Sequence, residues 1–125
     1  MWKKKCKCCE IIIEYRNKLS VKNILIKINQ NVDCTSENVI YILRCDSCQK
    51  YYIGKTTNQL SIRLNVHRNH IKNPEYSILP VSEHLRNCGE KYSISILFKC
   101  EDCEEIFLDR MEAYFIKLIK PELNG

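Results

Sequence analysis

Hydrophobic and polar positions alternate along this chain with a period of two in some stretches and a helical period in others. Ile24, Ile26 and Ile28 alternate with polar neighbours, which predicts a strand with one buried face. Residues 39–45 and 51–54 also read as strands. The polar residues between them, Asp46 to Lys50, are typical of a turn, so the two strands are predicted to form an antiparallel hairpin. The predicted strands are at residues 24–28, 39–45, 51–54 and 92–98, with a further apolar run at residues 11–13.

Helical periodicity predicts three helices between and after these strands, at residues 57–71, 81–86 and 103–119. Thr56 or Thr57 is the expected N-cap of the first helix, and Pro74 lies just beyond its end. The chain has 125 residues and no Gly/Ser-rich or Pro-rich linker. This pattern indicates one α/β domain built around one core.

The nine cysteines narrow the choice of cellular compartment and stabilising chemistry. The first residues go straight into charged and polar side chains without the apolar run of a signal peptide, and the odd number of cysteines leaves one thiol unpaired. An intracellular, reduced protein with zinc-binding cysteines is therefore expected. No apolar stretch approaches the roughly 20 residues needed to cross a bilayer, so no membrane partner is expected.

The first predicted helix places two polar side chains beside its apolar stripe. Leu60, Leu64 and Ile71 share the stripe, and Arg63 and His67, four residues apart, lie together at its edge. The pair is either a functional Arg–His couple or the solvated flank of an ordinary helix.

The last predicted helix carries an acidic residue within its apolar sector. Leu108, Met111, Phe115 and Ile119 define the face expected to be buried, and Glu112 lies one turn from Leu108 and Ile116. A desolvated carboxylate needs a cationic partner, because an unpaired charge there costs several kcal/mol. Two alternatives stay open: a salt bridge, for instance to Arg63, or a metal ligand.

Two tripeptides on the predicted hairpin resemble a known family signature. Val39-Ile40-Tyr41 followed by Tyr52-Ile53-Gly54 is similar to the paired motif of the GIY-YIG nucleases, although Val39 replaces the first glycine. The family's later elements follow in order: Leu60, Arg63 and His67 on one helix, Glu112 on the last helix, and Asn124 near the end. The resemblance implies an α/β (α+β) fold with a small antiparallel or mixed three-stranded sheet flanked by helices.

The resemblance is most specific to the nucleases of Penelope-like retroelements and related mobile elements. The run from Asn38 to Cys48, with a Cys pair between the signature strands, and the ending Pro121-Glu122-Leu123-Asn124 are similar to that branch. The branch tends to have a second His where this chain has Glu90, with Cys88 nearby. The resemblance implies a Cys-rich, basic N-terminal extension at residues 1–36, packed on a nuclease domain at residues 37–125.

The resemblance implies a catalytic set composed of Tyr41, Tyr52, Arg63, His67, Glu112 and Asn124. Glu112 is expected to hold one Mg²⁺ or Mn²⁺ ion, and Arg63 to donate to the scissile phosphate. Tyr41 is expected to act as the general base or as a relay to it, which requires neighbouring cations to lower its pKa. Gly54 is expected to let the backbone approach the phosphate, with Lys55 and Arg68 as further substrate contacts.

Two zinc sites are predicted, the first from the spacing of metal-binding residues and the second from cysteines that are similar to those of the same branch. Cys45 and Cys48 with His84 and Cys88 form a plausible tetrahedral set, the alternative being that His84 and Cys88 are simply interior residues. A weaker second set comprises Cys6, Cys9 and Cys34, with Cys8 as a spare ligand. Cys100 and Cys103 are unassigned.

The net charge of +5 and the pI near 8.7 favour a polyanionic partner, and DNA is the expected substrate. The basic head, Lys3 to Lys7, either contacts phosphates or is a solubilising tail. A larger element-encoded protein or a homodimer is a possible assembly, and the nucleus is the expected location. The alternative functions are an inactive, zinc-stabilised nucleic-acid-binding module with the same fold and a zinc-dependent protein-interaction domain.

Overall fold

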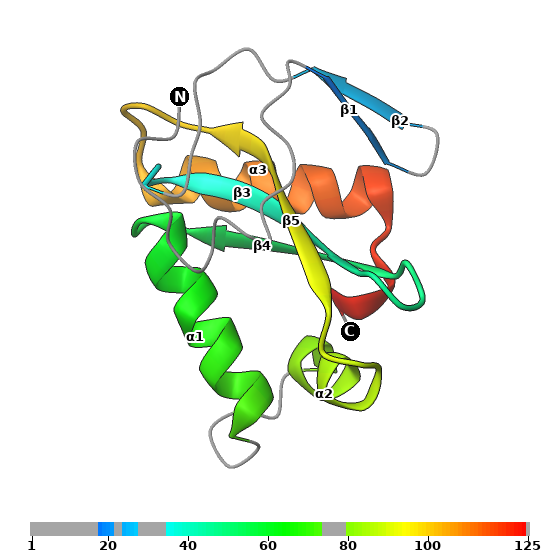
Figure 1. The fold of residues 1–125 in the computed structure, drawn as a ribbon. Helices are drawn as coiled ribbons and strands as arrows, with labels where there is room; N and C mark the ends of the chain where they lie inside the picture. The colour runs from blue at the N-terminus through cyan, green and yellow to red at the C-terminus, as the bar shows by residue number, and fades with distance from the viewer. Residues whose placement is uncertain (1–17, 22–23, 28–34, 74–79, 125) are drawn as a thin grey trace.

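The computed structural model describes residues 18–21, 24–27, 35–73 and 80–124. The element order is β1 (Lys18–Val21), β2 (Ile24–Lys27), β3 (Val39–Cys45), β4 (Tyr51–Thr56), α1 (Leu60–Lys72), α2 (Pro80–Asn87), β5 (Tyr92–Lys99), α3 (Glu105–Ile119) and the 3-10 turn η3 (Glu122–Asn124). Figure 1 shows their arrangement. The strands and helices predicted from periodicity within these residues are confirmed, with shifts of a few residues at their ends.

The main sheet has three antiparallel strands in the order β4-β3-β5. The central strand β3 is covered on both faces, and its sequence is accordingly almost continuously apolar. Val39, Tyr41 and Leu43 have no exposed surface. The pairing of β3 with β5 contains an irregularity between Ile40 and Tyr41. The separate hairpin formed by β1 and β2 has its own antiparallel register, and β1 was not predicted.

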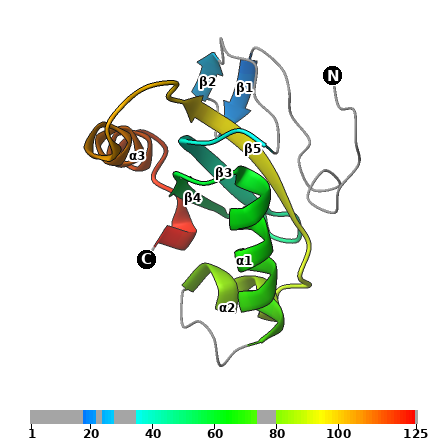
Figure 2. The ribbon, with the colours of Figure 1, turned by 90° about the vertical axis from the view of Figure 1, so that its left-hand side faces the viewer.

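Helices cover both faces of this sheet, as the two perpendicular views show (Figures 1 and 2). One face, with Tyr41 and Leu43, packs against α1 and α2 through Leu64 and Leu85. The opposite face packs against the buried side of α3, whose core residues are those expected from its periodicity: Leu108, Phe115 and Ile119, with Met111 partly buried. Strand β4 lies at an edge of the sheet, beside both α1 and α3.

The start of α1 differs from the prediction that Thr56 or Thr57 would be its N-cap. The capping residue is Gln59, which makes no capping hydrogen bond through its side chain. The first helical N–H, that of Leu60, instead donates to the carbonyl oxygen of Ser36 at 3.0 Å. Thr56 Oγ1 accepts from the N–H of Asn58 at 3.1 Å, so it stabilises the turn before the helix rather than the helix itself.

Side chains from distant segments form hydrogen bonds with backbone groups at the end of α1 and at the edge of β4. Arg86 on α2 donates to the carbonyl oxygens of His70 and Ile71 at 2.8 and 2.9 Å, and so satisfies the last turn of α1. The free edge of β4 is covered by η3, because the N–H groups of Tyr51 and Ile53 donate to Glu122 and Asn124. Such coverage leaves fewer unpaired groups on an edge strand.

No helix among the described residues has both the length and the apolar character required to span a membrane.

Candidate active site and metal centre

Tyr41 is the buried centre of the candidate active site. Its side chain projects from β3 towards α1 and lies over Gly54 on the paired strand β4. A Cβ atom at position 54 would lie 2.5 Å from Tyr41 Oη and 2.6 Å from its Cζ. The absence of a side chain at Gly54 therefore accommodates the phenol of Tyr41.

The hydroxyl of Tyr41 is held by both polar residues predicted on α1. Tyr41 Oη lies 2.7 Å from His67 Nε2, and Arg63 Nε donates to Tyr41 Oη at 3.3 Å. Because Arg63 has only donors, the hydroxyl accepts from Arg63, while the direction of its hydrogen bond with His67 Nε2 is set by the tautomer of the imidazole. His67 is 1% exposed, so it belongs to the core and not to the helix edge where the sequence placed it.

Tyr52 completes this aromatic cluster from strand β4. Its ring centroid lies 6.4 Å from that of Tyr41 and 5.7 Å from that of His67, in an edge-on arrangement with the imidazole. Burial works to lower the pKa of Arg63, but the phenols of Tyr41 and Tyr52 outweigh it and raise the pKa overall. Arg63 is therefore a permanent cation between two phenols.

Burial makes both partners of the Tyr41–His67 hydrogen bond neutral. It raises the pKa of Tyr41 well above its ordinary value, and the charge of Arg63 only partly offsets this effect. Burial, aided by the charge of Arg63, lowers the pKa of His67 to about 3. The expectation that cations lower the pKa of Tyr41 is therefore wrong for the protein alone, because desolvation of the phenolate is the larger effect.

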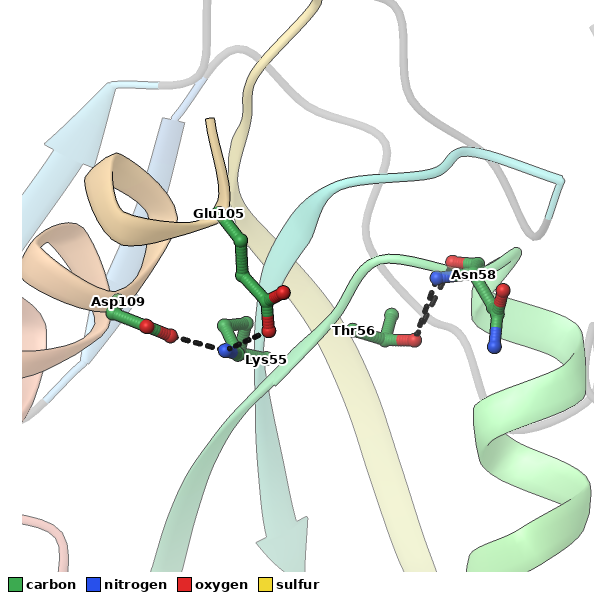
Figure 3. A network of polar contacts seen from close by, with 5 residues as sticks. All are labelled: Lys55, Thr56, Asn58, Glu105 and Asp109. Atoms are coloured by element: carbon green, nitrogen blue, oxygen red, sulfur yellow. Dashed lines mark hydrogen bonds and ion pairs between the residues drawn. The ribbon is translucent and has the colours of Figure 1, made fainter. Parts of the chain in front are cut away.

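Lys55, predicted as a substrate contact, is engaged by two carboxylates of α3 (Figure 3). Its Nζ donates to Glu105 Oε2 at 3.0 Å and to Asp109 Oδ1. These ion pairs raise the pKa of Lys55, so its ammonium stays charged. Sequence analysis missed Glu105 and Asp109, although their spacing from Glu112 places all three carboxylates along one side of a helix.

Glu112 lies half-buried on α3, facing the same edge of the sheet. Burial raises its pKa, whereas the nearby charges of Lys55 and Arg63 lower it. Its charge also acts on Tyr41, which places it near the aromatic cluster. Among the described residues it makes no ion pair, so the predicted alternative of a salt bridge to Arg63 is not formed. A partly desolvated carboxylate of this kind fits a hard divalent cation such as Mg²⁺.

Asn124 contributes to the site through strand β4. Its side-chain oxygen accepts from the N–H of Ile53, and its side-chain nitrogen donates to the carbonyl oxygen of Ile53, each at 2.8 Å. Both polar ends of the amide are therefore used to hold the segment between Tyr52 and Gly54. Asn124 is a positioning residue in this structure.

A cleft of about 270 Å³ opens beside Arg63, between the start of α1, the end of β4 and the start of α3. It is lined by Lys55, Thr56, Thr57, Asn58, Ile62, Arg63, Val66 and Glu105. Arg68, the other predicted substrate contact, does not line this cleft, and its Nη1 donates to Asn65 on the exposed side of α1 at 2.8 Å.

The four residues of the first predicted zinc set lie together at the other end of β3. Their ligand atoms, from Cys45, Cys48, His84 and Cys88, all lie within 4.8 Å of one another. Burial opposes ionisation of Cys45, but N–H groups of Cys48 and Ser47 at its sulfur lower the pKa of the thiol overall. Three sulfurs and one imidazole are a usual donor set for structural zinc, so the cluster can bind that ion.

The remaining cysteines have separate outcomes. Cys100 and Cys103 form a disulfide just before α3, so this unassigned pair joins neither predicted zinc set. The weaker set, Cys6, Cys9 and Cys34, and the spare ligand Cys8 lie outside the described residues, as do Ile28 and the basic head.

Comparisons with known proteins agree with this geometry. The family model described as the GIY-YIG catalytic domain matches residues 37–124, and the chain belongs to this family. Among solved structures, the catalytic domain of the homing endonuclease I-TevI is similar, with a TM-score of 0.58 and 19% identity over 71% of this chain and 95% of that chain. At this identity the likeness shows a shared fold. The search of curated proteins finds no match.

Proposed function

We propose that this protein is a metal-dependent endonuclease that hydrolyses phosphodiester bonds in DNA. The observation that carries the proposal is the gathering of Tyr41, Arg63 and His67 beside the half-buried Glu112 at the edge of β4. Packing alone does not favour a buried imidazole, a guanidinium and a carboxylate without an ion pair in one place. A phosphate and a cation satisfy these groups together.

Arg63 and Glu112 would bind the two charged components of the reaction. Arg63 uses Nε on Tyr41 and retains further N–H donors for the scissile phosphate. Glu112 would hold one Mg²⁺ or Mn²⁺ ion, which neutralises phosphate charge and makes a bound water more acidic. Lys55 is paired with Glu105 and Asp109, whose two negative charges outweigh its single positive charge, so Arg63 and the bound cation would supply the positive potential at the phosphate.

Tyr41 and His67 would move the proton of the attacking water. The raised pKa of Tyr41 disfavours a phenolate base, so the hydrogen bond to His67 favours a relay. Tyr41 Oη would receive the proton from water as it passes its own proton to His67 Nε2. The arriving phosphate charge raises the proton affinity of the imidazole, which is otherwise low. Tyr52 would orient the water, and Asn124 would hold Tyr52 in place through Ile53.

Zinc at Cys45, Cys48, His84 and Cys88 would stabilise the fold without taking part in the reaction. It would join the turn between β3 and β4 to α2. The Cys pair in that turn supports an origin in a Penelope-like mobile element, and we propose the nucleus as the site of action. Targeting would then depend on a larger element-encoded protein or on DNA structure, since the described elements offer little surface for reading many base pairs.

Nicking of supercoiled plasmid DNA in the presence of Mg²⁺ tests the proposal. Glu112→Gln should reduce the rate by about 10³-fold, because it removes the charge that binds the cation. Glu101→Gln is a matched control, since Glu101 is exposed and its ion pair within the described part of the chain is with Lys99 at the surface. Equal nicking by the parent and Glu112→Gln would refute the assigned role of Glu112. A folded parent that binds DNA without nicking it would favour the inactive nucleic-acid-binding module.

A further inference from the structure

Ile62 is an exposed apolar side chain beside the candidate active site. It is 50% exposed on α1 and immediately precedes Arg63. Four residues later, Val66 lies on the same side of the helix and is partly buried. Both residues line the cleft that also contains Arg63. An apolar surface therefore lies directly beside Arg63 in this cleft.

The other lining residues give the cleft two chemically distinct parts. Arg63, Thr57 and Asn58 offer cationic and hydrogen-bonding groups, and Lys55 is paired with the lining residue Glu105, whereas Ile62 and Val66 offer an apolar wall. A nucleotide has the same division, with an anionic phosphate at one end and an apolar base plane at the other. Proteins that bind DNA commonly insert aliphatic side chains against or between bases.

We propose that Ile62, supported by Val66, packs against the base of a nucleotide next to the scissile phosphate and so selects the position of cleavage. This inference rests on the proposed nuclease function, because Arg63 must hold the phosphate for its neighbour on α1 to reach the adjoining base. The contact buries the half of Ile62 that solvent now covers. The free energy gained by burying this apolar surface corresponds to an increase of about tenfold in kcat/KM.

The test uses short duplexes centred on a cleavage position mapped with the parent protein. Each flanking nucleotide is replaced in turn by an abasic analogue, which keeps the sugar and phosphate but removes the base. The parent should lose about tenfold in kcat/KM on one of the abasic duplexes. Ile62→Ser should lose about as much on intact DNA but be nearly insensitive to the same abasic replacement. Ile62→Leu should behave like the parent.

Leu118→Ser is the matched control, because Leu118 is 40% exposed and lies near the opposite end of α3 from the cleft residue Glu105. It should retain the rate and abasic sensitivity of the parent. Thermal melting checks that each variant is folded. Both substituted positions are about half exposed, so the substitutions should leave the fold intact. Equal abasic sensitivity in the parent and Ile62→Ser would overturn the base contact while leaving the nuclease function intact. A parent without any cleavage activity would overturn both.

Discussion

Replacing Gly54 with alanine would place a methyl group where the Tyr41 ring now lies. The new Cβ would meet Tyr41 Oη at 2.5 Å and Tyr52 Cε2 at 3.0 Å. The phenol cannot move aside freely, because it is fully buried and its hydroxyl contacts His67 and Arg63. We therefore expect Gly54→Ala to displace Tyr41 and to break both hydrogen bonds.

The expected loss in the free energy of unfolding is about 1–3 kcal/mol, the usual cost of overpacking a core. For a domain of this size, each kcal/mol lowers the melting temperature by roughly 4 °C. The loss should become much smaller when Tyr41 is first replaced by leucine, which lacks the ring. Alanine then meets only Tyr52 Cε2 at 3.0 Å, and it restricts the unfolded chain more than glycine does, a gain of about 0.5–1 kcal/mol that offsets part of this contact.

Urea denaturation of the parent, both single variants and the Tyr41→Leu/Gly54→Ala double variant measures this coupling. The nicking rate of Gly54→Ala should fall together with its stability, since the displaced hydroxyl no longer reaches His67. If Gly54→Ala costs the same free energy in both Tyr41 backgrounds, the requirement for glycine does not come from the phenol, and the reasoning is refuted.

Three further predictions concern pH, zinc and the edge of β4. The pKa of His67 is lowered to about 3 in the folded protein, so its contribution to stability is present above about pH 6.5 and falls by about 2 kcal/mol at pH 5. His67→Gln, whose amide can still accept from Tyr41, should abolish this pH-dependent part in urea titrations, and an unchanged slope would contradict it. Chelation of zinc should destabilise the parent by about 3 kcal/mol or more, whereas Cys48→Ser should be insensitive to the chelator; a parent that melts identically with chelator has no structural zinc. Asn124→Ala should lose about 1–3 kcal/mol of unfolding free energy, because the backbone N–H and carbonyl groups of Ile53 lose their partner. Asn69→Ala, at an exposed position, is the control, and equal melting temperatures of the two variants would count against the positioning role of Asn124.

Regular elements were predictable because their signals are local. The apolar run of β3 and the apolar sectors of α1 and α3 depend only on residues a few positions apart, and they match the buried residues observed. The start of α1 was not predictable in this way, because the group that caps it is a carbonyl oxygen of Ser36, far from Leu60 in sequence. The burial of His67 did follow from spacing, because it lies three residues after Leu64 and four before Ile71 and therefore within the apolar stripe of α1 and not at its edge.

The zinc set could be predicted from the sequence, whereas the ion pairs of Lys55 could not. The spacing of Cys45, Cys48, His84 and Cys88 identified ligand types that have few other uses together, and the fold brings their ligand atoms within 4.8 Å. Glu105 and Asp109 carry no such signal, since exposed acidic residues at helical spacing are common. Only the tertiary arrangement of β4 beside α3 shows that they hold Lys55.

The position of β4 at the edge of the sheet explains how residues from opposite faces form one site. Tyr52 packs with the cluster on the α1 side, and its neighbour Ile53 packs with the cluster on the α3 side. In the middle of a sheet, neighbouring strands would separate groups on these two faces. Beside an edge strand they are not separated, so the charge of Glu112 on α3 acts on Arg63 and Tyr41. The order β4-β3-β5 is therefore a condition for the chemistry, since a further strand beside β4 would separate the carboxylate from the guanidinium.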